Sequence, residues 1–304
     1  MNIVHKEGRQ LSLIVVNFNA GAYLQACITS VKNDCDQILV VDNASTDNSS
    51  VELRRKFYDL EKLQLIENAE NLGFSKACNI GIKNATGNFL FFLNPDCVVA
   101  PGAISRLMQT LEDRKDVGMV GGLITFPDGR EQAGGRRAIP TPWRSFVRAS
   151  HLSSLATRYP RLFSDFLLHR EPLPDHAVEV EAISGACMMV RREALADVGL
   201  LDEGYFMHCE DLDWCMRFRL RDWKILFVPD AQVMHHKGGS SGSRPIFIEW
   251  HKHKGMVRFY RKFFRHQYPN ILMPLVVVGV WTRFVAKAIW ISLRKIRHKP
   301  EPPL

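Results

Sequence analysis

The sequence predicts an α/β fold in which a parallel sheet is covered by helices on both faces. Short apolar runs alternate with helix-like segments through the first hundred residues, which is typical of such a sheet. The runs show no alternation of apolar and polar side chains, and this favours strands that are buried on both faces. The composition agrees, because 46% of the 304 residues are hydrophobic and 24% are charged. A disordered or fibrous chain is therefore excluded.

The first half contains four predicted strands and three predicted helices. The strands cover residues 11–16, 37–41, 63–66 and 89–93, and the helices cover residues 22–31, about 45–60 and 74–83. Branched and aromatic apolar side chains dominate the strands. Ser and Thr residues after the second strand offer N-caps for the helix that follows it.

The second half begins with an irregular stretch. Residues 126–179 are rich in Gly, Pro and Arg and then in aromatic residues, so we expect an insertion or acceptor-side lid there. Regular structure is predicted to resume at Ala182. Residues 186–190 are predicted as a strand, 192–198 and 212–221 as helices, and 224–228 as a strand that ends at Pro229.

Polar residues follow each of the first four strands. They are Asn17 and Asn19, then Asp42 and Asn43, then Asn71 and Gly73, and finally Asn94, Pro95 and Asp96. The carboxyl ends of parallel strands share one edge of the sheet, where loops and helix N-termini receive ligands. We therefore expect a ligand site at this edge.

Asp96 follows a very apolar strand directly. A solvated carboxylate at this place can hold a divalent cation against phosphate oxygens. Asn, Pro and Asp also end strands for purely local reasons, so a simple turn is an equal alternative.

A second acidic group lies at a predicted helix start. Glu210, Asp211 and Asp213 would be stabilised in their ionised forms by the helix dipole. Glu210 and Asp213 should point in different directions, so a joint role is not expected. The cluster is interpreted either as a capping group or as the source of a general base.

Two histidines, His235 and His236, follow Pro229 and precede a Gly-rich turn. Adjacent histidines are usually structural or exposed. An imidazole beside a strand end could instead join Asp96 in binding a metal, while the turn at residues 238–241 admits phosphate.

Charge and cysteine content point to a compartment and to a surface. The seven cysteines form no CxxC pair and the first ten residues lack an apolar leader, so a reducing cytoplasm is expected. Residues 244–304 hold 13 Lys/Arg and 2 Asp/Glu, a net charge of +11, which leaves −3 on residues 1–243. The basic charge thus belongs to the C-terminal segment, and no nucleic-acid motif accompanies it.

Six segments together carry a resemblance to a known family. They are VVNFN, VVDNASTDNS, NLGFSKACNIGI, FLFFLNPD, SGACMMVRREALADVGLLDEGYFMHCEDLDWCMR and VPDAQVMHHKGGSS. The chain closely resembles the family 2 glycosyltransferases, which are inverting enzymes of the GT-A fold, and among them the bacterial rhamnosyltransferase-like group. The resemblance covers residues 11–241 and implies a Rossmann-like mixed sheet in a catalytic domain of residues 1–243.

The resemblance implies a donor site for a nucleotide sugar. The residues that match the family's donor-binding positions are Asn17, Asn19, Asp42, Asn43, Asn71, Gly73, Phe74, Asn79, Asn94 and Asp96. The family's Asp-x-Asp motif is present here as Asn94-Pro95-Asp96, so its first acid is missing. The resemblance implies a divalent cation, Mg²⁺ or Mn²⁺, on Asp96 and His235.

The resemblance also implies the catalytic and acceptor residues. The family's acidic pair matches Glu210 and Asp211, and of the two Asp211 is expected to be the base. Ser184, Gly185 and Ala186 are expected on the acceptor side, where small residues permit close approach.

The implied function is transfer of rhamnose or another 6-deoxyhexose from a dTDP-sugar to a hydroxyl of a lipid-linked saccharide in cell-surface polysaccharide synthesis. UDP-hexose or UDP-N-acetylhexosamine donors are the alternative within the same fold. A nucleotidyltransferase and a non-catalytic nucleotide-sugar-binding protein are the other classes considered. A nucleotidyltransferase has no evident use for the acidic pair. Retention of Asp211 and His235 argues against a non-catalytic binding protein.

Residues 244–304 are expected to form an amphipathic helical tail on the cytoplasmic membrane surface. The apolar stretch at 271–281 is followed by Arg283 and Lys287, so it is not expected to cross a bilayer. On a helix, one face would carry Arg283, Lys287, Arg294 and Arg297, and the other Trp281, Val285, Ala288, Ile289 and Ile296. Packing of the helix on the enzyme itself is the alternative.

Overall fold

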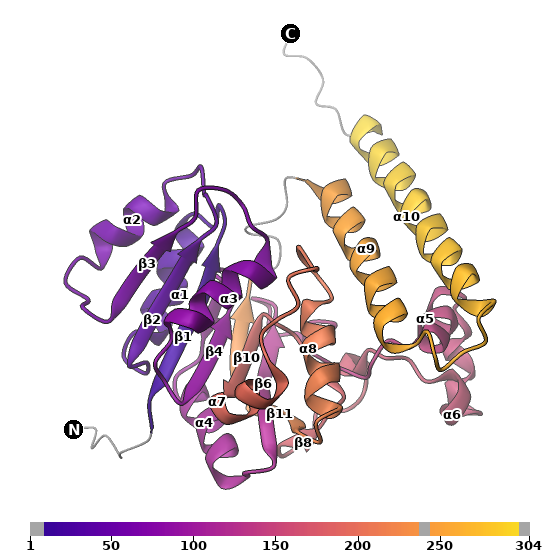
Figure 1. The fold of residues 1–304 in the computed structure, drawn as a ribbon, viewed down its shortest axis with the longest axis horizontal. Helices are drawn as coiled ribbons and strands as arrows, with labels where there is room; N and C mark the ends of the chain where they lie inside the picture. Colours follow the sequence, from indigo (N-terminus) through magenta and orange to yellow (C-terminus); the bar gives the residue numbers. More distant parts are fainter. Residues whose placement is uncertain (1–8, 237–243, 298–304) are drawn as a thin grey trace.

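The computed structural model describes residues 9–236 and 244–297, with side chains as far as residue 294. A mixed nine-stranded sheet runs through the molecule, with helices on both faces and two long helices at one end (Figure 1). The path of the sheet is β3-β2-β1-β4-β10-β6-β11-β5, and β8 pairs with β11 beside this path.

The first half of the sheet is parallel, as predicted. Its strands are β1 (Leu11–Asn17), β2 (Gln37–Asp42), β3 (Leu63–Glu67) and β4 (Phe89–Leu93). The intervening helices are α1 (Ala22–Val31), α2 (Ser49–Lys56) and α3 (Phe74–Asn84). Only α2 is clearly shorter than expected. The carboxyl ends of these strands therefore meet at one edge.

The second half departs from the parallel arrangement. β10 (Cys187–Arg191) lies antiparallel between β4 and β6 (Val117–Thr125), while β6 and β11 (Lys224–His235) are parallel. β5 (Cys97–Val99) is antiparallel to β11. A fully parallel sheet was the wrong expectation from the strand pattern alone, because β10 follows the insertion and enters from the opposite edge. The mixed sheet that the family resemblance implies is the one observed.

Pro229 does not end its strand. β11 continues to His235, and its register against β6 shifts between Val228 and Gln232. Pro229 lies in this irregular part, where a missing backbone N–H breaks no regular ladder. The predicted end at residue 228 was therefore wrong, and the longer strand carries His235 to the functional edge.

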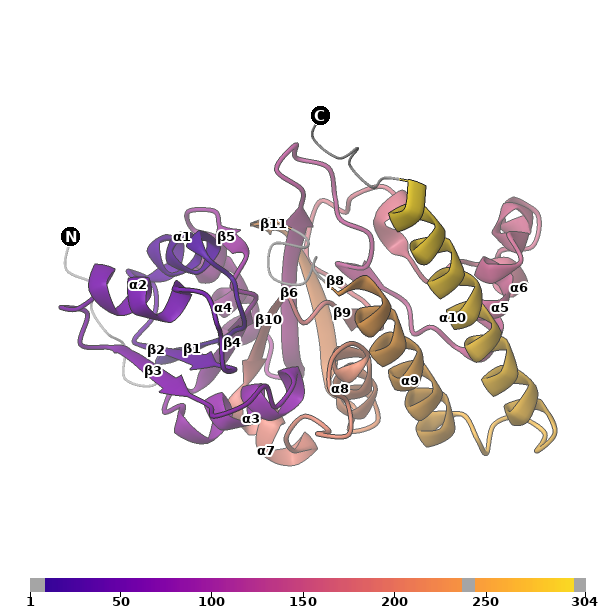
Figure 2. The same ribbon diagram turned by 90° about the horizontal axis from the view of Figure 1, so that it is seen from above.

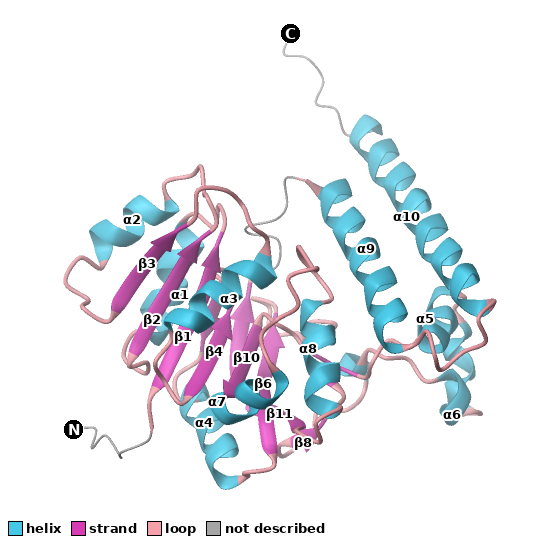
Figure 3. Cartoon of the chain, viewed as in Figure 1, coloured by secondary structure: helices cyan, strands magenta, loops and turns pink. Residues whose placement is uncertain are grey.

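Each central strand feeds two separate cores. In β1, Leu13 and Val15 pack with α1 and with α4 (Ala103–Asp113) on one face, whereas Ile14 and Val16 pack with α3 on the other. That second core also holds residues of α7 (Arg192–Val198) and α8 (Glu210–Arg219). Helices thus cover both faces of the sheet (Figure 3), which explains why the strands are apolar throughout.

The insertion contains more ordered structure than the sequence indicated. Its elements are β7 (Arg136–Arg137), α5 (Pro142–Ala149), the 3-10 turn η1 (Leu152–Thr157), α6 (Pro160–Phe163), the 3-10 turn η2 (Leu168–Arg170) and β8 (Val178–Glu179). β7 pairs antiparallel with β9 (Ala182–Ile183), directly before β10. The start of the insertion is therefore anchored beside β9, next to the second half of the nine-stranded sheet.

The basic C-terminal segment forms two helices with different environments. α9 (Pro245–Phe263) packs into the second core through Phe259 and Tyr260. α10 (Leu272–Arg297) lies along α9 (Figure 2). The Trp281 ring contacts that of Trp250 in a tilted arrangement, with ring centroids 4.8 Å apart. The expected alternative, packing on the enzyme itself, is thus observed for one face of α10.

The other face of α10 is apolar and exposed. Its large side chains, together with Ile271 just before the helix, are Ile271, Leu275, Val278, Val285, Ile289, Trp290 and Leu293, each more than half exposed. We call this set the exposed apolar face. The predicted division of the helix was partly wrong, because Trp281 and Lys287 both face α9, where Lys287 donates to Glu249 at 2.9 Å. Arg297 and Ile296 lie where side chains are not described.

Arg283 and Lys287 do not interrupt the helix. By length and composition alone, residues Leu272–Arg294 are long and apolar enough to cross a membrane, and little of this stretch is buried. That this segment does not cross a bilayer stays a prediction from the sequence.

All seven cysteines are buried and none forms a disulfide.

Candidate active site

The loops after β1 and β2 are tied together by buried amide and carboxylate groups. Asn17 Nδ2 donates to Asp42 Oδ1 at 2.6 Å and to Ser49 Oγ at 2.8 Å. The other Asp42 oxygen accepts from the Ser45 N–H, and Asn19 Oδ1 accepts from the Thr46 N–H at 2.7 Å. The structure thus brings these predicted donor-site residues together at one edge of the sheet.

The third loop joins the same edge. Asn43 Nδ2 donates to Asn71 Oδ1 and to the Gly73 carbonyl, both at 3.1 Å. Gly73 has φ +83°, and a Cβ there would come within 2.5 Å of the Phe206 carbonyl, so only glycine fits. The Phe74 N–H donates to that same carbonyl at 2.7 Å. The Phe206 carbonyl, which lies against Gly73 and Phe74, therefore connects the start of α3 to the segment before α8.

Asn79 makes its hydrogen bonds elsewhere. Its side-chain amide donates to the Leu201 carbonyl and to Glu203, and its oxygen accepts from the Leu201 N–H, each at 3.0 Å. The contacts of this buried side chain lie in the loop before α8. They do not connect it to the loops after β1 and β2.

Asp96 and His235 form a close pair on the other side of the site. His235 Nε2 lies 3.1 Å from Asp96 Oδ1, and that buried oxygen has no hydrogen-bond donor. Cys97 completes a group whose ligand atoms lie within 4.8 Å of one another. Burial keeps the pKa of the Cys97 thiol well above its usual range. The His236 ring instead lies on Tyr23, with centroids 5.0 Å apart.

Gln132, which sequence reasoning missed, fixes the His235 ring. Its Nε2 donates to the carbonyls of His235 at 2.7 Å and Thr125 at 3.2 Å, so its Oε1 is the atom that faces His235 Nδ1 at 3.0 Å. Nδ1 then carries a proton for Gln132, and in the neutral ring Nε2 presents a lone pair to Asp96. Two acceptors at this distance repel unless a positive charge lies beside them. The pair therefore fits a divalent cation such as Mg²⁺ or Mn²⁺.

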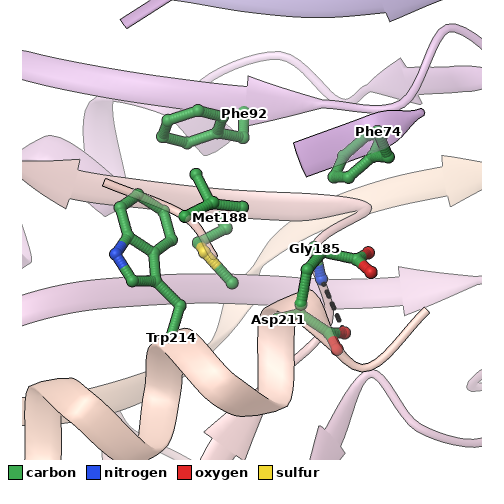
Figure 4. A pocket seen from close by; sticks show the side chains of 8 residues that line it. Phe74, Phe92, Gly185, Met188, Asp211 and Trp214 are labelled. Atoms are coloured by element: carbon green, nitrogen blue, oxygen red, sulfur yellow. Dashed lines mark hydrogen bonds between the residues drawn. The ribbon is translucent and has the colours of Figure 1, made fainter. Parts of the chain in front are cut away.

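Asp211 lies in the first turn of α8. One carboxylate oxygen accepts from the Gly185 N–H at 3.2 Å and forms an ion pair with Arg137, while the other accepts from the Leu212 N–H at 2.7 Å (Figure 4). Gly185 also adjoins the Phe74 ring. Asp211 is therefore fixed beside a donor-site residue that the sequence predicted.

The turn Ser184–Ala186 connects the two sides of the site. The Gly185 N–H bonds to Asp211, and the carbonyl of the next residue, Ala186, accepts from the Asn94 N–H at 3.0 Å. Asn94 begins the turn that contains Asp96. Adjacent residues of this turn thus link the Asp96 side to the Asp211 side.

The three acids at the start of α8 have different states. Burial, and then the charge of Asp211, raise the pKa of Glu210 to about 8, so the expectation that all three are ionised is wrong for Glu210. Asp213 is fully buried and ion-paired with Arg217 at 2.8 Å and Lys262 at 2.6 Å. Glu210 keeps its proton at neutral pH and Asp213 is structural. Asp211 is the member of the cluster that can accept a proton.

The arrangement agrees with a family match. Residues 12–199, more than half of the chain, match the profile of the family described as glycosyl transferase family 2. The chain belongs to this family. It is a glycosyltransferase with the GT-A fold.

Two curated relatives are similar over most of their length. The chain is 28% identical over 249 residues to the N-acetylglucosaminyl-diphospho-decaprenol L-rhamnosyltransferase of Mycobacterium tuberculosis, covering 77% of this chain and 78% of the relative. It is 22% identical over 261 residues to the rhamnosyltransferase WbbL of Escherichia coli K12, covering 79% and 88%. The family 2 glycosyltransferase described here thus resembles rhamnosyltransferases.

A solved structure shares the fold. The mannosyltransferase PcManGT from Pyrobaculum calidifontis, in complex with GDP-Man and Mn²⁺, superimposes with a TM-score of 0.58 at 18% identity over 90% of this chain and 70% of that one. At this identity the likeness shows the fold alone. That neighbour holds Mn²⁺ together with its nucleotide sugar.

Glu210 gives this glycosyltransferase a pH-dependent stability. The folded state holds the Glu210 proton up to about pH 8, whereas the unfolded chain releases it near pH 4.5. The stability linked to this proton is fully present below pH 4.5 and is lost as the pH rises through about 8. In urea denaturation between pH 5 and pH 8, we expect the free energy of unfolding to fall more steeply for the wild type than for Glu210→Gln. Glu61→Gln, in an exposed turn, is the control, and equal slopes for all three proteins contradict the assignment.

Proposed function

We propose that this glycosyltransferase moves rhamnose or another 6-deoxyhexose from a dTDP-sugar, with inversion, to a hydroxyl of a lipid-linked saccharide used in cell-surface polysaccharide synthesis. The observation that supports it most is the Ser184–Ala186 turn, whose peptide groups bond to Asp211 on one side and to the Asp96 turn on the other. The names of the relatives in M. tuberculosis and E. coli support the sugar and the lipid-linked acceptor.

The proposed reaction is a single displacement. The acceptor oxygen forms a bond to the anomeric carbon as the bond from that carbon to the donor diphosphate breaks. Asp211 takes the proton of the attacking hydroxyl, and its three hydrogen-bond partners hold it in one orientation. Glu210 keeps its own proton at neutral pH and is proposed to support Asp211 without acting as base. Ser184, Gly185 and Ala186 line the acceptor side.

The donor is proposed to bind along the loops after β1, β2 and β3. Asn19, Asp42 and Asn71 are among the polar residues whose hydrogen bonds hold these loops together. Asp96 and His235 would hold the divalent cation at the diphosphate end, with Gln132 orienting the imidazole. When bound, the cation neutralises negative charge on the departing diphosphate.

The proposed place of work is the cytoplasmic face of the cell membrane. The seven free, buried cysteines agree with a reducing compartment. The exposed apolar face of α10 gives the protein a surface that lipid can cover, and Arg283 and Arg294 are exposed on the same helix. A peripheral enzyme bound in this way meets a lipid-linked acceptor at the inner leaflet.

Replacement of the proposed base tests the reaction. With a panel of labelled nucleotide sugars and a lipid-linked saccharide acceptor, the wild type should transfer from one donor, for which dTDP-rhamnose is expected. Asp211→Asn should lower kcat by about 10² to 10⁴ because no group then takes the proton. Donor affinity, measured by calorimetry with dTDP, should stay within about threefold, since Asp211 does not bind the nucleotide. Asp222→Asn, on the exposed surface, is the control. Near-normal turnover by Asp211→Asn overturns the assignment, and a preference for a UDP-sugar overturns the donor.

The cation site is tested by a pair of neighbouring residues. In calorimetric titrations of Mn²⁺ in the presence of dTDP, His235→Ala should weaken binding by at least about tenfold because a ligand is lost, while His236→Ala should bind as the wild type does. Gln132→Leu should weaken binding by about 10- to 100-fold because the ring is no longer oriented. Equal affinities for the two histidine variants contradict this cation site.

The membrane surface is tested with charges on the exposed apolar face. We expect the wild type to float with vesicles that contain anionic lipid, and Val285→Glu combined with Ile289→Glu to remain unbound, because buried carboxylates oppose insertion. Deletion of residues 270–304 should likewise move the enzyme to the soluble fraction. Tyr58→Glu, on an exposed side chain at the other end of the molecule, is the control. Flotation of the double variant contradicts the surface, and resistance of the wild type to alkaline carbonate extraction contradicts peripheral binding.

A further inference from the structure

We propose that Arg137 is a positioning residue for the base, supplying the counter-charge that holds the Asp211 carboxylate in place while the acceptor hydroxyl approaches. This inference rests on the proposed function, in which Asp211 is the base. Arg137 belongs to the insertion, and no motif in the sequence marks it. Its role would make the insertion part of the catalytic apparatus.

The backbone around Arg137 is held on several sides. Arg137 pairs with Ala182 of β9 and forms a bridge with Leu167. The preceding Arg136 is itself buried, donating to Glu131 at 2.9 Å and to the Glu171 carbonyl at 2.8 Å. The insertion thus fixes the two-residue strand from both ends. The Arg137 side chain starts from a rigid support.

The guanidinium of Arg137 is directed at the start of α8. It donates to Asp211 Oδ2 and, at 3.3 Å, to the carbonyl of Ile183. The Nε atom is buried without an acceptor, so the hydrogen bonding of the guanidinium is incomplete. The contact with the carboxylate is therefore the interaction that best explains where the guanidinium lies. Described hydrogen bonds to Asp211 come from Arg137, Gly185 and Leu212, and Arg137 alone among these brings a charge.

The other ionisable groups around Asp211 are uncharged at neutral pH. Burial, reinforced by the charge of Asp211, raises the pKa of Glu210 to about 8. Burial lowers the pKa of His208 to about 4, and it raises the pKa of the Cys209 and Cys215 thiols far above neutrality. Each of these groups therefore faces Asp211 in its neutral form.

Two further cations influence the groups around Asp211 without a described hydrogen bond to Asp211 itself. Lys252 of α9 and Arg219 at the end of α8 influence the neighbouring cysteines, and neither is among the described hydrogen-bond donors to Asp211. Arg137 and Asp211 thus form a charge pair within a largely neutral, buried surrounding. Removing one charge leaves the other uncompensated.

Two physical effects of Arg137 oppose each other. A cation beside a buried carboxylate favours its ionised form and restrains its orientation, but it also makes the carboxylate a weaker base. If the first effect dominates, Arg137 supports turnover. If the second effect dominates, Arg137 slows turnover and its removal speeds the reaction. The neutral surroundings favour the first effect, because Arg137 is the charged group among the described hydrogen-bond donors to this carboxylate.

The test compares Arg137→Met, which removes the charge at similar length, with Arg137→Lys, which retains it. The readouts are kcat, the donor KM and the pH profile of kcat/KM, using the donor on which the wild type is active. Arg137→Met should lower kcat by at least about tenfold, leave the donor KM within about threefold, and move the acidic limb of the profile to higher pH by about one unit or more. Arg137→Lys should keep the wild-type limb and recover part of kcat. Arg130→Met, at an exposed arginine of the same insertion, should match the wild type.

Several results overturn the inference. A raised kcat in Arg137→Met shows that Arg137 slows turnover, and an unchanged kcat shows that it has no role in turnover. A lowered kcat with an unmoved acidic limb of the kcat/KM profile shows a purely structural role. A limb that moves equally in Arg137→Lys contradicts the counter-charge. Thermal unfolding establishes that each variant is folded, and Arg137→Gln replaces the methionine variant if that one does not fold. A wild type that transfers no sugar refutes the proposed function instead, as does full activity of Asp211→Asn.

Discussion

The site depends on one short stretch of backbone, the turn Ser184–Ala186. Its Gly185 N–H binds Asp211 and its Ala186 carbonyl binds the Asn94 N–H, so the start of α8 and the end of β4 are held to adjacent residues. β10 follows this turn antiparallel to β4, and that reversed direction is what brings the turn to the carboxyl end of β4. The mixed order of the sheet is therefore a condition for assembling the site.

The insertion builds the site as well as bordering it. Gln132 orients His235 on the cation side, and Arg137 pairs with Asp211 on the other, although the two residues lie only five positions apart in the chain. Both are polar groups nearly withdrawn from water, and each satisfies a residue that comes about 70 to 100 positions later in the chain. A change in the length of this short connection would disturb both sides of the site at once.

Local physics explains which parts of this glycosyltransferase were predictable. Fully apolar runs such as Phe89–Leu93 identified the buried strands, and the polar residues after them identified the functional edge. The direction of β10, the passage of β11 through Pro229 and the partners of Asn79 depend on contacts between distant segments, which no single window of sequence contains. The protonated state of Glu210 was missed for the same reason, because the folded surroundings that exclude water are set by the whole chain.

α9 gives the molecule a fixed internal length. Lys262 near its end is bonded to Asp213 of α8, two residues after Asp211, and Glu249 near its start is bonded to Lys287 of α10. These two anchors lie 13 positions apart on α9, a rise of about 20 Å. Because α10 lies along α9, this length would run parallel to a bilayer on which α10 rests. The carboxylate would then sit at a fixed lateral offset from the helix that binds lipid, and the enzyme would reach acceptors beside that helix along the membrane surface.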